Sequence, residues 1–125
     1  GREYWQRGMG GMDGVRERNT NQPAIQTETP MAMHVGIATV ELEVTDAMTL
    51  KDKRQVIRSL LARIRHTFNV SAAEVGHLQA HTRSALGFAA VANDKTYVHG
   101  LLEKVVDLIE REPRVLVLDY TTELV

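Results

Sequence analysis

The order of hydrophobic periods along the chain constrains its fold more than any other feature. Residues 35–45 alternate apolar and polar side chains, which is the period of a half-buried strand. Residues 50–68 and 94–112 repeat apolar side chains at spacings of three and four, which predicts two amphipathic helices. Three further strands are predicted at residues 70–76, 83–92 and 114–124. The predicted order is therefore β-α-β-β-α-β.

This order predicts an α+β fold, the ferredoxin-like βαββαβ sandwich. Two right-handed crossover units interleave in it, which gives a four-stranded antiparallel sheet with two helices on one face. The other face stays open, and Val35 and Ile37 are expected on it, opposite Val40 and Leu42. A half-apolar open face is typical of a dimer interface or a binding platform.

Residues at the predicted helix ends have the chemistry of caps. Thr49 and Asp52 have the spacing of a capping box, and Asp94 is the expected N-cap of the second helix. Asn69 is expected to end the first helix in a left-handed conformation. Lys53 falls within the apolar stripe of the first helix, where we expect only its aliphatic stem to be buried.

Residues 1–32 differ from the rest of the 125-residue chain. They hold five of its nine glycines, and their apolar residues follow neither a helical nor a strand period. Such a segment cannot bury enough surface to offset its ordering entropy, so we predict a disordered N-terminal tail or extension, followed by one domain at residues 33–125. The absence of cysteines, of a signal peptide and of an apolar run of membrane-spanning length favours a cytoplasmic protein.

Charge is unevenly distributed, although the formal net charge is −1. Residues 47–93 carry seven basic and two acidic side chains, whereas residues 94–125 carry four basic and seven acidic ones. On the first helix, four basic residues at helical spacing share one flank: Lys51, Arg54, Arg58 and Arg65. Such a row, with Lys53 and Arg63 beside it, suits phosphate contacts, and a simple solvated helix face is the alternative.

The RNA-recognition motif shares this topology and stacks bases on aromatic side chains of its sheet. Residues 86–91 of the third strand read Leu-Gly-Phe-Ala-Ala-Val, with Ala90 where a second aromatic belongs. The first strand has no aromatic residue. Base stacking on the sheet is therefore not expected, and any RNA contact is expected through the basic helix and a structured RNA.

Glu74, His77 and His81 form an acid–base cluster around the predicted hairpin of the second and third strands. A carboxylate near an imidazole can act in general acid–base catalysis, but Glu74 and His77 are expected on opposite faces of the sheet. The spacing of the two histidines on a loop does not define a metal site. We therefore assign no catalytic residue, no metal and no cofactor.

Three segments resemble the YlxP-like family, a bacterial domain of unknown function. They are Leu50-Lys-Asp-Lys-Arg54, the stretch from Phe68 to His77, and Leu86-Gly-Phe-Ala-Ala-Val-Ala-Asn-Asp94. The resemblance covers about residues 33–125 and implies a ferredoxin-like fold. Family genes tend to lie beside those of a translation initiation factor and a ribosome-binding factor, which implies a role in translation or ribosome assembly. Outside the basic helix, the family pattern marks a second surface to test: Glu74, Gly76, His77, Asn93 and Asp94.

The residues and the resemblance together predict a non-enzymatic accessory factor. It is expected to bind structured RNA or the ribosome through its basic first helix: Lys51, Lys53, Arg54, Arg58 and Arg65. The first alternative is a homo-oligomeric structural or regulatory module without nucleic acid, because the second and fourth strands form sheet edges. The second alternative is a small acid–base enzyme using Glu74 and His77. No membrane contact is expected.

Overall fold

The computed structural model describes residues 31–125, which form a unit from Ala32 to Val125. Disorder was predicted for residues 1–32. Of these, residues 1–30 lie outside the described part of the chain.

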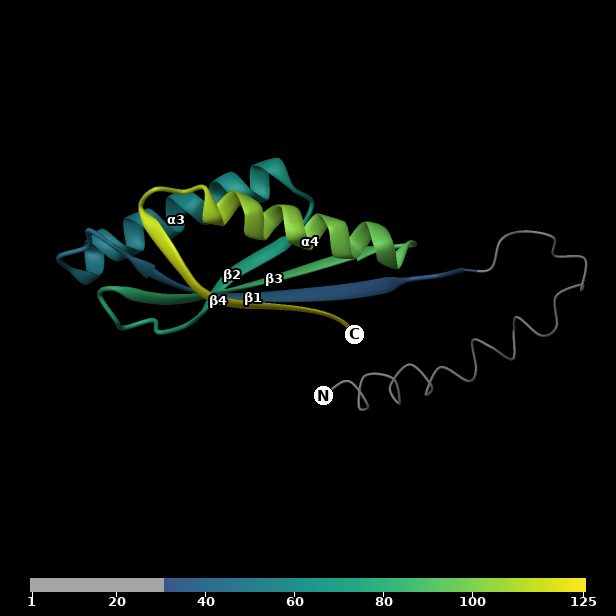
Figure 1. Ribbon diagram of the computed structural model, residues 1–125, viewed down its shortest axis with the longest axis horizontal. Helices are drawn as coiled ribbons and strands as arrows, with labels where there is room; N and C mark the ends of the chain where they lie inside the picture. The colour runs from purple at the N-terminus through teal and green to yellow at the C-terminus, as the bar shows by residue number, and fades with distance from the viewer. Residues whose placement is uncertain (1–30) are drawn as a thin grey trace, which may run out of the picture. The chain divides into compact units, whose positions relative to one another are not determined.

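Four strands and two helices alternate in the predicted order. They are β1 His34–Val44, α3 Leu50–Thr67, β2 Ser71–Gly76, β3 Arg83–Ala92, α4 Lys95–Glu110 and β4 Val115–Leu124. The strands pair antiparallel in the order β2-β3-β1-β4, and Figure 1 shows both helices on one face of the sheet. The predicted ferredoxin-like α+β sandwich is confirmed.

Strand β1 is one of the two central strands of the sheet and pairs with β3 on one side and β4 on the other. Its alternating pattern is confirmed, because Val40, Leu42 and Val44 are buried under the helices. At Gly36 the sheet and α4 come so close that an added Cβ would lie 2.5 Å from Val98 Cγ1. The absence of a side chain at Gly36 therefore allows the start of β1 to pack against α4.

The N-terminal caps of both helices are those predicted from the sequence, whereas the C-terminal end of α3 is not. Thr49 accepts a hydrogen bond from the Asp52 backbone, and the Asp52 carboxylate accepts one from the Thr49 backbone, which completes the predicted capping box. Asp94 caps α4 as predicted by accepting from the Thr96 backbone. The prediction that Asn69 ends the first helix in a left-handed conformation is wrong. Helix α3 ends at Thr67, and Phe68, in an extended conformation, is its C-cap.

The two sheet edges differ in length and in chemistry. Strand β2 has six residues, and its outer side lies beside α3, from which Arg65 Nη2 donates to the Ala72 carbonyl at 2.6 Å. Strand β4 has ten residues, with Leu116, Leu118 and Tyr120 exposed. Short length and a nearby cation are devices that discourage edge pairing, so β2 is the better protected edge.

Within residues 31–125, neither helix combines the length and the apolar character needed to cross a membrane.

Candidate functional site

A buried ion pair joins the first turns of α3 to the end of β2. Lys53 is completely buried, and its Nζ donates to Glu74 Oε2 at 2.8 Å and to the His77 carbonyl at 3.0 Å. The expectation that only the Lys53 stem is buried is therefore wrong, since the ammonium group lies inside as well. Burying a cation is unfavourable unless a counter-charge and hydrogen bonds replace its water, and Glu74 and His77 supply both.

Ser84 extends this network into β3. Its hydroxyl is buried and donates to Glu74 Oε2 at 2.7 Å, so one carboxylate oxygen receives hydrogen bonds from both α3 and β3. The sequence offered no signal for this role, because Ser84 gains its partner through pairing of β2 with β3. The network fixes how α3 sits on the sheet through polar contacts that a rotated helix would lose.

His77 adopts the left-handed backbone conformation that was expected at Asn69. Its φ of 57° makes it the one non-glycine residue with a positive φ in residues 31–125. This conformation presents its carbonyl to Lys53, while its ring Nε2 lies 3.2 Å from Glu41 Oε1 on the open face of the sheet. Glu74 faces the helices instead, so the two side chains are on opposite faces, as predicted, and do not form an acid–base pair.

The basic row is exposed along the flank of α3 that faces away from α4. Lys51, Arg54, Arg58 and Arg65 all have exposed side chains, and their Cα positions span about 21 Å of helix. Arg65 reaches the β2 edge, which places this flank beside that edge. Lys53 does not belong to the row, because burial removes its ammonium group from any surface contact. The basic row is therefore defined by these four residues.

Arg63 lies on the opposite flank of α3 and has a structural partner. Its Nη1 lies 3.3 Å from Glu112 Oε1, and Arg114 Nε donates to Glu112 Oε2 at 2.8 Å. Glu112 is 3% exposed and links α3 to the start of β4. Hydrogen bonds from Arg114, together with the charges of Arg114 and Arg63, lower the pKa of Glu112 to about 2 against the desolvation that raises it. Glu112 was not predicted as a site residue: Arg63 comes from a distant segment, and Arg114, only two residues away, was an available local signal.

The five residues that the family resemblance marked as a second surface lie in two separate parts of the structure. Glu74, Gly76 and His77 gather where β2 ends, around the Lys53 ammonium group. Asn93 and Asp94 follow the opposite end of β3, and Asp94 is occupied as the cap of α4. The distance along β3 from Ala85, which pairs with Gly76, to Ala92 is about 23 Å. These five residues therefore do not form one surface.

Phe88 lies in the core, 3% exposed, on the helix side of β3. It therefore cannot stack a base on the open face, which agrees with the argument against an RNA-recognition motif. The open face carries no aromatic side chain on β1, β2 or β3 within the described residues.

The element order, the sheet topology and the placement of both helices define the class, a ferredoxin-like α+β domain. Residues 35–122 match the model of the family described as "Protein of unknown function (DUF503)", and the chain belongs to this family. It is also 33% identical over 81 residues to the "Uncharacterized protein YlxP" of Bacillus subtilis (strain 168), a match that covers 65% of this chain and 88% of that protein. The resemblance expected from the sequence is thereby confirmed.

The buried ion pair predicts an asymmetric effect of substitutions. Glu74→Leu leaves the Lys53 ammonium buried without its counter-charge and is expected to lower the free energy of unfolding by about 3–5 kcal/mol. Adding Lys53→Met removes that charge, so the double variant should be more stable than Glu74→Leu alone. Urea denaturation measures all three proteins. A double variant less stable than the single one would contradict the role assigned to the pair.

The lowered pKa of Glu112 predicts an acid-sensitive contribution to stability. Its folded-state pKa lies near 2 and its ordinary value is 4.5, so the stabilisation is present above about pH 4.5 and is lost as the pH falls toward 2. Glu112→Gln should therefore destabilise the protein at pH 7 by roughly 1–3 kcal/mol and by less at pH 3. Urea denaturation at both pH values tests this. An equal difference at pH 7 and pH 3 would show that the charge is not responsible.

Proposed function

We propose that the protein is a non-enzymatic accessory factor that binds structured RNA, on the ribosome or during its assembly, through the basic row. The observation that carries the proposal is the exposure of Lys51, Arg54, Arg58 and Arg65 on one flank of one rigid helix. A helix holds its side chains at fixed intervals, so a row of about 21 Å can follow successive phosphates of a folded RNA strand.

The rest of the molecule supports the helix, and not the sheet, as the RNA-binding element. No acidic residue lies three or four positions from any residue of the basic row, and Asp52, the acidic residue of α3, is occupied in the capping box. Arg65 donates one of its hydrogen bonds to the β2 edge and has further donors for a phosphate. The open face of the sheet carries Glu41, Glu43 and Asp119 and would repel a phosphate backbone.

The non-enzymatic part of the proposal rests on the side chains that could do acid–base chemistry. The Glu74 carboxylate is occupied by Lys53 and Ser84, and the His77 ring contacts Glu41 on the other side of the sheet. Both groups therefore hold the fold together and do not point toward a common substrate position.

The proposal predicts a salt-dependent affinity that the basic row controls. The full chain should bind a hairpin RNA in filter binding, with an affinity that falls steeply between low and moderate salt. Arg54→Glu with Arg58→Glu should weaken binding by at least about tenfold and flatten the salt dependence.

The matched control reverses two exposed cations on α4, Lys95→Glu with Lys104→Glu, and changes the net charge equally. It should bind nearly as tightly as the wild type. Equal losses in the two variants would mean that net charge, and not the basic row, determines binding. No binding by the wild type at low salt would refute the proposal.

A homo-oligomeric module is the second candidate, and the contrast between the two edges favours it. Strand β4 is the longer edge, and Leu116, Leu118 and Tyr120 are exposed along it. Two copies related by a two-fold axis could pair their β4 strands antiparallel and continue the sheet. RNA binding by the basic row is compatible with such a dimer.

Light scattering of the full chain measures this second candidate. We expect a dimer that becomes monomeric in Leu118→Lys, because a charge at a sheet edge opposes pairing. The control Leu78→Lys, on the β2–β3 turn, should remain dimeric. A wild-type monomer at the highest soluble concentration would exclude the β4 interface.

A further inference from the structure

The open face of the sheet is an apolar feature that the proposed RNA contact does not use. Its side chains alternate with the buried ones along each strand and face away from both helices. The apolar and small residues on it are Val35, Ile37, Ala73, Val75, Ala85, Gly87, Ala89, Val91 and Leu116. Val75, Val91 and Leu116 are each more than half exposed.

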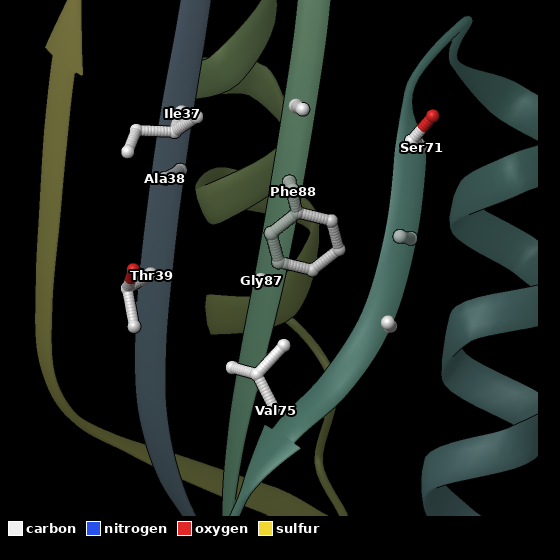
Figure 2. Close-up of a pocket in the computed structure, with 10 residues that line it drawn as sticks. Ile37, Ala38, Thr39, Ser71, Val75, Gly87 and Phe88 are labelled. Carbon is white, nitrogen blue, oxygen red and sulfur yellow. The ribbon is translucent and has the colours of Figure 1, made fainter. Parts of the chain in front are cut away.

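The middle of this face is hollowed. A shallow depression of about 360 Å³ lies over β1, β3 and β2, and most of its lining is apolar. Figure 2 shows Ile37 and Thr39 on β1 to one side of Gly87, and the Val75 side chain of β2 lying over β3 next to Gly87. Ala73 and Ala89 contribute only a methyl group each, whereas Val75 covers Gly87, where an added Cβ would lie 3.1 Å from Val75 Cγ1. A partner side chain can therefore approach most closely over Ala73 and Ala89.

Acidic residues border the hollow along β1 and β4. Glu41 lies directly opposite Asp119 across the two strands, and Glu123 lies opposite Ile37. Like charges in direct cross-strand register are unfavourable by themselves. Glu41 has His77 as a neighbour at 3.2 Å, and Glu43 pairs in register with Arg83. Among residues 31–125, the carboxylates of Glu41, Glu43, Asp119 and Glu123 nevertheless outnumber the one arginine and one histidine of the rim.

We propose that the open face binds a basic amphipathic helix of another protein. A helix is the element that covers the other side of this sheet, and a third layer of the same kind would bury Ile37 and Val75 under its apolar stripe. Its lysines or arginines would then lie over Glu41 and Asp119. Positive potential on the partner also relieves the repulsion between these two carboxylates.

Other occupants fit the face less well. A second copy docked by two-fold symmetry would bring two acidic rims together, at an electrostatic cost that a basic partner avoids. RNA would meet the same carboxylates, and β1, β2 and β3 offer it no aromatic side chain on this face to stack on. The face therefore favours a basic protein partner, independently of RNA binding on α3.

The test uses the full chain and a fluorescein-labelled model helix of about 18 Leu and Lys residues, which is long enough to cross the sheet. Fluorescence anisotropy should show binding of this helix and none of a helix in which every Lys is replaced by Glu. Asp119→Lys and, separately, Ala73→Arg at the exposed floor of the hollow should each weaken binding by at least about fivefold.

The matched control is Asp107→Lys, which makes the same charge change at an exposed position of α4, on the other side of the molecule. It should bind the Leu/Lys helix as the wild type does. An equal loss in Asp107→Lys and Asp119→Lys would reduce the interaction to general charge attraction and overturn the proposal. Failure of the wild type to bind, or self-association through the face that Ala73→Arg abolishes, would also overturn it.

Discussion

The ion pair between Lys53 and Glu74 is the interaction on which the arrangement of this domain depends. The ammonium group is fully buried, so its position tolerates little change without exposing an unpaired charge to the interior. Its partners come from β2 and from the turn after β2, and Ser84 adds β3 to the same network. Four segments are thus tied to one point near the start of α3.

The contacts of Lys53 determine how α3 is rotated about its own axis. With Lys53 turned inward, the helical period places Lys51, Arg54, Arg58 and Arg65 on the flank beside the β2 edge. The opposite flank sends Arg63 to Glu112, which holds the helix on its other side. The basic row is therefore presented by a helix fixed at both flanks, and its geometry is set before any ligand arrives. Such preorganisation reduces the entropy lost on binding.

Charge divides the molecule into two surfaces with different chemistry. The basic row lies on the helix side along the β2 edge, and the carboxylates of β1 and β4 lie on the open face. An RNA on α3 and a basic protein helix on the open face would not compete for the same residues. If both proposals hold, this polarity would let one small domain join a nucleic acid and a basic protein.

Local sequence signals predicted the fold well because they depend on neighbouring residues. The alternation in β1, the Thr49–Asp52 capping box and the Asp94 cap each involve residues close in the chain, and all three are confirmed. The long-range features were not predictable in this way. Lys53 looked like a buried stem because a helical period gives the direction of a side chain but not its partner.

The left-handed residue and the buried carboxylate show the same limit. Asn69 has the usual preference for the left-handed conformation, yet His77 adopts it, where its carbonyl meets Lys53. The second helix was predicted to end at Glu112. Arg114 lies two residues further along the chain, but Arg63 becomes a partner of Glu112 only when α3 packs beside the start of β4. Both sites therefore depend on a tertiary contact made by α3, from Lys53 in the first case and from Arg63 in the second.

The central claim is that nucleic acid meets α3 and not the sheet. An NMR titration of the ¹⁵N-labelled chain with a hairpin RNA tests it most directly. The account predicts amide shift changes along the flank of Lys51, Arg54, Arg58 and Arg65 and at the neighbouring β2 edge, with Ile37, Gly87 and Ala89 unaffected. Changes centred on those open-face residues, with α3 unaffected, would contradict it.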